Sequence, residues 1–329
     1  MQKIEANFEI VTPMFIGGAD KTEPPEIRPP SIKGALRFWW RALHWGRYLQ
    51  EAQGNKDQAL QNLHQKEAEL FGAAFRDDKY GQGLCTLKLK NVVTKGTEES
   101  WPSNNDPGAG FLGYGLDRTK EEPHRKAVSQ GSFTVCLILK KEINDEQITQ
   151  LKNTLTMWGL LGGAGSRSRR GFGSVAIKKL DNQEFNFKTA EQYGAEVRAL
   201  LNKITLSPEM PIFTALNDAM TIAEAGIGND ARRLMDRLGS QYKNARKEAG
   251  AGLAKLPFGL PLAGNRGSSD EDNRRSSPLL MHIHPIDKQF VAMISFIPAD
   301  FHPDYPKGQQ IDFYKTLQDY LSPMERIYP

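Results

Sequence analysis

The sequence predicts an α+β fold with two halves, each an antiparallel sheet backed by helices. A chain of 329 residues is long enough for two domains of ordinary size. In the first half, strand and helix patterns follow the order β, α, β, β, α, β, with one further helix after the first. The second half shows a looser copy of that order. We therefore expect two ferredoxin-like (RRM-like) domains, one at residues 1–185 and one at residues 186–329.

The elements of the first half follow from residue periodicity. Apolar residues alternate along positions 4–10, which predicts an opening strand. Ser31 is suited to cap a helix in which apolar residues then recur at helical spacing. The further elements are a helix at 56–71, strands at 84–93, 132–140 and 173–180, a loop at 97–115 and a helix at 145–161.

The second half is less regular. It predicts a helix at 190–203, a strand near 212–222, a helix at 231–246, strands at 279–284 and 290–297, and a helix at 311–321. No final strand is visible, because only residues 326–329 are left for it. The segment 264–277 is polar, rich in Gly and Ser and mixed in charge, so we expect a mobile surface loop there.

The composition excludes several classes of protein. No apolar run approaches the ~18 residues that a membrane-spanning helix needs, and the N-terminus lacks the pattern of a secretion signal. Cys85 and Cys136 are the only cysteines, too few for a disulfide framework or a four-thiolate zinc site. We therefore expect a protein of the reducing cytoplasm that has no membrane partner.

The charge distribution points to a polyanionic partner. The net charge of +4 is modest, but two blocks, at 27–50 and 147–180, carry cations and no Asp or Glu. The cations of these blocks are Arg28, Lys33, Arg37, Arg41 and Arg47, and then Lys152, Arg167, Arg169, Arg170, Lys178 and Lys179. A solvated helix face normally mixes both signs, so an acid-free block favours contact with a polyanion.

The helix predicted from residue 31 has two different faces. Ile32, Leu36, Trp39 and Leu43 form an apolar face, and the adjoining face carries Lys33, Arg37, Trp40, Arg41, His44 and Tyr48. The second face suits a single-stranded nucleic acid, with cations for phosphates and aromatic rings for bases. Alternatively, the tryptophans pack in the core and the arginine stems cover them. We expect Trp39 in the core, and Lys33, Arg37 and Arg41 at the partner.

A glycine-rich segment at 161–173 gives the strongest local signal. Of its five glycines, those proposed for close backbone approach to a ligand are Gly163, Gly165, Gly171 and Gly173. Its three arginines, Arg167, Arg169 and Arg170, supply charge and paired donors. Exposed amides and guanidinium groups together suit an RNA backbone. The alternative is a flexible connector whose arginines are only solvated.

Three other patterns are not taken as functional. Residues 108–113 match a dinucleotide-binding string, but a Pro-containing loop precedes them where a strand is required. Residues 170–177 partly match an RNA-recognition strand, yet they lack the stacking aromatics. His282 and His284 show no recognised metal-ligand spacing, and no Walker lysine follows the glycines. We expect no cofactor and no metal.

RNA cleavage is the competing hypothesis. His44, near the first helix, is placed to take a proton from a 2′-hydroxyl, but no acid obviously accompanies it. Asp20, in the loop after the first strand, suits a metal or a 2′-hydroxyl, and it equally suits a turn. The residues therefore favour a binding protein over a nuclease.

The opening of the chain resembles the RAMP superfamily of CRISPR-associated proteins. Residues 12–20 (TPMFIGGAD) and 27–41 (IRPPSIKGALRFWWR) carry this resemblance, and they are most similar to the first-subunit family of Cmr (type III-B) effector complexes. Further similar stretches lie at 111–115, 162–173, 258–262 and 274–279, so the resemblance covers most of the chain.

This resemblance implies two ferredoxin-like domains in a non-catalytic RNA-binding subunit that serves antiviral defence. The implied partners are single-stranded RNA, namely the 3′ part of the guide and/or the target, and other RAMP subunits of the complex. In such complexes a different, repeated subunit cleaves the target with an aspartate in the loop after its first strand, and guide-processing relatives often use a histidine near the first helix. Asp20 and His44 occupy comparable regions, so a RAMP endoribonuclease is the alternative.

Overall fold

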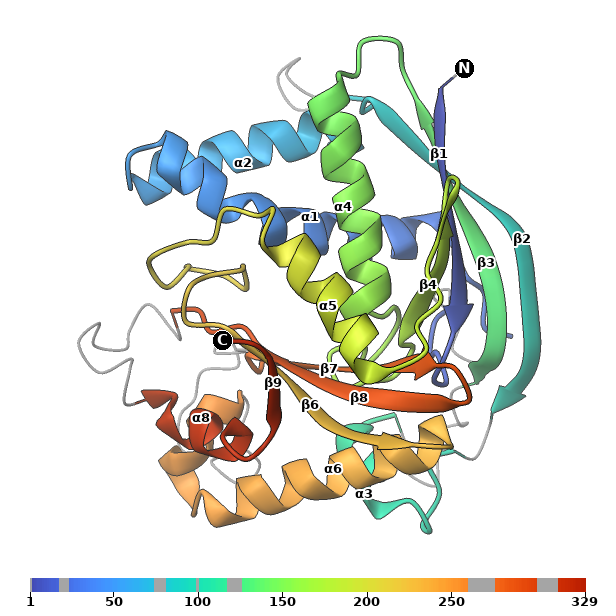
Figure 1. Ribbon diagram of the computed structural model, residues 1–329, viewed down its shortest axis with the longest axis vertical. Coiled ribbons are helices and arrows are strands. Elements are labelled where there is room, and N and C mark those ends of the chain that lie inside the picture. Colours follow the sequence, from blue (N-terminus) through green and yellow to red (C-terminus); the bar gives the residue numbers. More distant parts are fainter. Residues whose placement is uncertain are drawn as a thin grey trace.

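Two antiparallel sheets organise the chain, and helices pack against each of them (Figure 1). The computed structural model describes residues 2–17, 24–73, 81–98, 101–116, 126–259, 276–300 and 313–329. The predicted α+β fold with two helix-backed antiparallel sheets is confirmed. Within these ranges, no helix combines the length and the apolar character that crossing a bilayer requires.

The first sheet has the strand order β2-β3-β1-β4-β5. Its strands are β1 (Lys3–Ile10), β2 (Cys85–Glu98), β3 (Ala127–Leu139), β4 (Val175–Leu180) and β5 (Gln183–Glu184). In the central strand, Phe8 is paired with Phe133 of β3 and with Ile177 of β4. Every second residue of β1 from Ile4 onward is buried, because this face of the sheet packs against helices.

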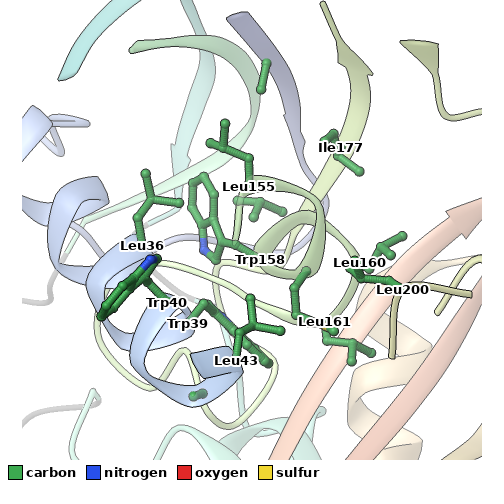
Figure 2. Close-up of a cluster of buried hydrophobic side chains, with 14 of the residues drawn as sticks. Leu36, Trp39, Trp40, Leu43, Leu155, Trp158, Leu160, Leu161, Ile177 and Leu200 are labelled. Atoms are coloured by element: carbon green, nitrogen blue, oxygen red, sulfur yellow. The ribbon is translucent and has the colours of Figure 1, made fainter. Parts of the chain in front are cut away.

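Three helices cover the buried face of the first sheet. They are α1 (Pro29–Glu51), α2 (Lys56–Phe71) and α4 (Asp145–Leu161). Figure 2 shows Leu36 and Trp39 of α1 in one apolar cluster with Leu155 and Trp158 of α4. Helix α1 is therefore fixed by its apolar side, and positions on its other side are partly exposed mainly in the first half of the helix.

Helix α1 begins earlier than the expected cap at Ser31. Arg28 is the N-cap residue, and Pro29 and Pro30 form the start of the first turn. Proline suits this position because its φ is already helical and it has no N–H to leave unpaired. Ser31 lies inside the helix, so the expectation of a Ser31 cap is wrong.

The second sheet repeats the arrangement of the first, with the order β7-β8-β6-β9. Its strands are β6 (Thr221–Gly228), β7 (Leu279–Ile286), β8 (Gln289–Phe296) and β9 (Glu325–Tyr328), and the helices are α5 (Ala190–Leu201), α6 (Ala231–Glu248) and α8 (Lys315–Leu321), with a 3-10 helix at Gly252–Phe258. β6 lies further along the chain than the predicted 212–222. The expectation that a final strand is missing is wrong, because β9 pairs with β6 at the edge of the sheet.

A short helix, α3 (Pro107–Leu112), lies within the segment 97–115 that was expected to be a loop. The chain around it is rich in Gly and Pro, so its helical form depends on a tertiary contact. The Oδ1 atom of Asp236 in α6 accepts the N–H groups of Gly108 and Ala109 at 2.8 and 2.9 Å. These bonds satisfy amides that have no partner within the first turn of a helix.

The two sheets are joined by backbone and side-chain contacts. Arg170, just before β4, forms a parallel bridge with Met281 of β7. The proposed domain boundary after residue 185 falls between β5 and α5, and it stays a prediction. Of the expected mobile loop at 264–277, residues 264–275 lie outside the described residues.

Candidate nucleic-acid interface

Helix α1 and the glycine-rich segment lie against each other, although more than a hundred positions separate them in the chain. The Arg169 guanidinium carbon lies 5.2 Å from the centre of the Phe38 ring. Both segments also line one pocket, to which α1 contributes Ala35, Phe38 and Trp39. Parts of the two basic sequence blocks are therefore neighbours in the folded chain.

The solvent-facing side of α1 carries cations, whereas the aromatic part of the predicted basic face is buried. Trp40, His44 and Tyr48 are all buried. Trp40 stacks on His44 with ring centres 4.8 Å apart. Five of the fully or partly exposed positions of the helix are here named the α1 stripe: Lys33, Gly34, Arg37, Phe38 and Arg41. The alternative in which this face offers aromatic rings to bases does not hold for Trp40 and Tyr48, and the expected burial of Trp39 is confirmed.

One buried carboxylate holds two arginines of the α1 stripe. Arg37 Nε and Arg41 Nη1 each lie 2.6 Å from the same oxygen, Oε1 of Glu67, which reaches them from α2. The Glu67 side chain is only 3% exposed, so its burial costs free energy unless such partners are present. These two guanidinium groups are thus engaged by the protein itself, and the three side chains together keep one net positive charge.

Two arginines of the glycine-rich segment lie near its surface. Arg167 is exposed and donates from Nη2 to the carbonyl oxygen of Tyr114. Arg169 is half-buried, and its two terminal nitrogens donate to the Ser277 carbonyl at 2.8 Å and to the Thr214 hydroxyl at 2.7 Å. Arg169 therefore links the glycine-rich segment to the second half of the chain with its guanidinium held in a fixed plane.

Arg170 turns into the interior instead. Its guanidinium carbon lies 4.5 Å from the centre of the buried Tyr242 ring in α6, and its Nη1 atom is buried. Attraction between the cation and the ring stabilises this position. The structure thus places Arg170 away from the surface that was expected for it.

The glycines of the segment pack against the protein's own backbone. A Cβ on Gly173 would lie 2.1 Å from the Ala164 carbonyl oxygen, and a Cβ on Gly165 would lie 2.6 Å from that of Phe15. Both have positive φ angles, +61° and +90°. The N–H groups of Ala164 and Gly173 are bonded to the carbonyls of Gly173 and Pro13. The expected close approach is therefore to the chain itself, and these amides are not available to an anion.

Gly163 and Gly171 also serve the fold. The Gly163 carbonyl accepts the indole N–H of Trp158 at 3.0 Å. Gly171 is buried, and a Cβ there would meet Met235 of α6 and Met281 of β7. The part of the glycine-rich segment that projects toward solvent is therefore short, and it centres on Gly165 and Arg167.

His44 is enclosed in the helix layer and does not face a substrate. Its side chain is 6% exposed, and Nδ1 lies 2.7 Å from the Trp40 carbonyl oxygen. Burial lowers the pKa of His44 from its ordinary value of 6.5 to about 4. A 2′-hydroxyl does not reach this ring, so His44 is not placed to act as a general base. Asp20, the other candidate for cleavage, lies outside the described residues.

His282 and His284 connect the two halves of the protein. His282 Nδ1 lies 2.9 Å from the Gly162 carbonyl oxygen at the end of α4. His284 stacks on Tyr193 of α5 with ring centres 4.4 Å apart. Burial lowers the pKa of His282 to about 3. Within the described ranges, no three His, Cys, Asp or Glu side chains are grouped to bind a metal.

Helix α6 carries a second cationic surface that was not predicted from the sequence. Its exposed cations are Arg233, Arg237, Lys243 and Lys247. Asp236 and Glu248 lie within this helix, so it is not an acid-free block, but Asp236 is engaged with α3. The sequence signal for this surface is two pairs of cations at i,i+4 spacing, away from the apolar positions of the helix.

The sequence is similar to a known superfamily and to two known proteins. The sequence model of the RAMP superfamily matches residues 7–176. The chain is 27% identical over 336 residues to the CRISPR system Cmr subunit Cmr1-1 of Pyrococcus furiosus, covering 94% of this chain and 91% of that protein. It is also 27% identical over 185 residues to subunit Cmr1-2 of that organism, covering 53% of this chain and 94% of that protein.

Solved structures share the fold along nearly the whole chain. The crystal structure of Cmr1 from Pyrococcus furiosus, apo form, matches with a TM-score of 0.66 at 22% identity, covering 100% of this chain and 99% of that one. A chain in the cryo-EM structure of the Type III-B Cmr-beta bound to cognate target RNA matches with a TM-score of 0.62 at 13% identity, covering 97% and 99%. The superfamily match spans more than half of the 329 residues, from the first strand to β4, and the chain therefore belongs to the RAMP superfamily.

Proposed function

We propose that this chain is a Cmr1-type subunit of a type III-B effector complex and that it binds single-stranded RNA there without cleaving it. Membership of the RAMP superfamily and the similarity to two Cmr1 subunits support the assignment. The similar chain in the Type III-B Cmr-beta belongs to a complex that is bound to target RNA. The bound strand in this protein is the 3′ part of the guide, the target, or both, and the neighbours are other RAMP subunits in a cytoplasmic complex.

One observation carries the proposal: the α1 stripe and the glycine-rich segment form a shared surface. Arg169 contacts Phe38 there, and Lys33 and Arg167 extend the surface with positive charge. Cations that neutralise phosphates release the counterions condensed on the RNA, and this release favours binding whatever the nucleotide sequence of the RNA. The surface thus suits contact with the RNA backbone.

Salt dependence tests this proposal directly. If Lys33, Arg167 and Arg169 contact phosphates, the logarithm of affinity falls against the logarithm of salt concentration with a slope of about −2. Affinity for a short single-stranded RNA then drops roughly twentyfold between 50 and 200 mM salt, as measured by fluorescence anisotropy. A slope near zero overturns the proposal.

Charge reversal locates the surface. The double variant Lys33→Glu with Arg167→Glu is expected to weaken RNA binding strongly and to flatten the salt slope. The matched control is the double variant Lys203→Glu with Lys315→Glu, which reverses two exposed lysines, after α5 and at the start of α8, and is expected to leave binding near that of the unaltered chain. If the surface variant and the control variant lose RNA affinity to the same extent, only the net charge of the protein attracts the RNA. The proposed surface is then rejected.

Cleavage is tested separately with the purified chain. Intact RNA after incubation with Mg²⁺ supports a binding subunit. Cleavage that disappears in Asp20→Ala overturns the non-catalytic part of the proposal and leaves the binding part to the salt experiment.

A further inference from the structure

A pocket opens where α1 meets the glycine-rich segment. Its volume is about 240 Å³. The residues that line it are Ala35, Phe38 and Trp39 of α1, Leu161 to Gly163 at the end of α4, Ser168 and Arg169, and Leu280 of β7. Three segments that are distant in the sequence, namely α1, the glycine-rich segment and β7, therefore form one concave site at the proposed RNA surface.

The walls of the pocket are apolar, but two hydrogen-bond donors lie among them. Leu161 and Leu280 are buried, and Phe38 is only partly so. Among the described residues, neither the Trp39 indole N–H nor the Ser168 hydroxyl has a side-chain hydrogen bond. A ligand with flat apolar faces and polar edge atoms matches this lining, because the donors would find acceptors on its edge.

Arg169 adds a planar cation in a fixed orientation. Its hydrogen bonds to Ser277 and Thr214 hold the guanidinium, whose carbon lies 5.2 Å from the centre of the Phe38 ring. Guanidinium planes and aromatic rings are both surfaces on which nucleic-acid bases stack. Because the protein already holds the Arg169 guanidinium in place, the binding of a base costs little free energy for ordering that side chain.

The position of Phe38 connects the pocket to the cations of the proposed RNA surface. Phe38 lies on the α1 stripe, which carries Lys33, and it contacts Arg169 of the glycine-rich segment, which carries Arg167. An RNA strand whose phosphates contact these cations passes the mouth of the pocket. Because the pocket adjoins this RNA path, its favoured occupant is part of the same RNA strand.

From this lining and this continuity we infer that the pocket holds one nucleobase of the single-stranded RNA, turned out of the strand. The inference rests on the proposed function, since it needs RNA at this surface. Stacking tolerates every base, so the pocket contributes affinity without strong sequence preference. The site adds a contact with a base to a surface otherwise built for phosphates.

The experiment compares two ligands of equal length and charge: an oligoadenylate and a ribose–phosphate oligomer without bases. A stacked base contributes on the order of 1–3 kcal/mol, so the full chain is expected to bind the oligoadenylate about fivefold more tightly or better. In Ala35→Phe, which fills the pocket and changes no charge, this ratio is expected to approach one while the salt slope is kept. The control is Gly110→Ala in α3, because this position lies outside the proposed RNA surface and a Cβ at Gly110 meets nothing within 4 Å.

The outcomes separate this inference from the proposed function. If neither oligomer binds, both are rejected. If both oligomers bind equally well to the unaltered chain with a steep salt slope, the proposed function stands and the base pocket is rejected. If Ala35→Phe keeps the preference for bases and instead weakens association with neighbouring subunits, the pocket holds a protein side chain, which also overturns the inference.

A second measurement needs no substitution in the protein. An RNA that carries 5-iodouridine is crosslinked to the full chain by light, and the modified peptides are sequenced. Crosslinks at Phe38 or Trp39 support the inference. Crosslinks found only in peptides that do not line the pocket overturn it, whether or not Ala35→Phe folds.

Discussion

Gly108 of α3 and Gly239 of α6 bring two helices from different halves of the chain into backbone contact. A Cβ on Gly239 would lie 2.1 Å from the Gly108 carbonyl oxygen, and a Cβ on Gly108 would lie 1.9 Å from the Asp236 carbonyl oxygen. The Asp236 carboxylate accepts the N–H groups of Gly108 and Ala109 at the same contact. The segment after β2 is thus anchored on the helix layer of the second sheet.

This contact predicts that Gly239→Ala destabilises the protein. The added methyl group overlaps the backbone of α3, and overpacking of this kind costs about 1–3 kcal/mol. Urea denaturation of the variant is expected to show a lower midpoint with an unchanged slope. The control is Gly34→Ala, which gains about 0.5–1 kcal/mol at an exposed helix position because alanine orders more readily there. Two variants of equal stability contradict the helix contact.

Glu67→Gln is expected to separate stability from RNA binding. Loss of the buried carboxylate removes two charged hydrogen bonds, from Arg37 and Arg41, and costs about 1–3 kcal/mol of stability. Both guanidinium groups are then free to meet phosphates, so RNA affinity at low salt is expected to rise and the salt slope to steepen by about 0.7 for each added contact.

The control for this substitution is Glu69→Gln, on the same helix. Glu69 forms an ion pair with Lys66 at 2.9 Å near the surface, where Glu69 is partly exposed, and such pairs contribute about 0–1 kcal/mol. Denaturation and anisotropy are expected to change little. If Glu67→Gln weakens RNA binding at temperatures where it is fully folded, then the carboxylate positions the arginines for RNA, and the view that it competes with RNA is wrong.

Stability is expected to fall with acid below pH 6.5 because of buried histidines. In the folded protein burial lowers the pKa of His44 to about 4 and that of His282 to about 3, whereas both return to about 6.5 on unfolding. Between these values the unfolded state binds more protons, so each group lowers stability by up to about 1.4 kcal/mol per pH unit as pH falls, and adds nothing above pH 6.5.

The variant His44→Phe isolates one of these contributions. Phenylalanine keeps an aromatic ring against Trp40 and does not titrate, so the loss of stability between pH 6.5 and 4 is expected to be shallower than in the unaltered chain. His64→Gln, at an exposed position of α2, serves as the control. Identical pH profiles for His44→Phe and the unaltered chain contradict the burial of a neutral imidazole.

Regular periodicity explains which elements were predicted correctly. Positions 4–10 alternate because one face of β1 is buried, and the apolar positions of α1 recur because one side packs on α4. Helix α3 was missed because its Gly- and Pro-rich sequence argues against a helix, and the hydrogen bonds that Gly108 and Ala109 donate to Asp236 outweigh that preference. β9 was missed because four residues carry no period and its pairing with β6 is a long-range contact.

The candidate site was predictable in its segments and not in its side-chain partners. Helical spacing places Lys33, Arg37 and Arg41 on one side of α1, as the α1 stripe shows. Nothing in that spacing reveals that Glu67 on another helix holds both arginines. In the same way, composition identifies the glycine-rich segment, but only the packing against Tyr242 shows that Arg170 turns inward.

Arg167 and Arg170 are therefore expected to respond differently to the same substitution. Arg167→Met changes an exposed side chain, so stability should stay within about 0.5 kcal/mol while RNA affinity falls and the salt slope flattens by about 0.7. Arg170→Met removes the cation above Tyr242 and is expected to cost about 1–2 kcal/mol of stability with no change in the salt slope. Urea denaturation and anisotropy on both variants decide the matter. If Arg170→Met flattens the salt slope at full stability, its guanidinium contacts RNA, and the inward placement does not hold in the bound state.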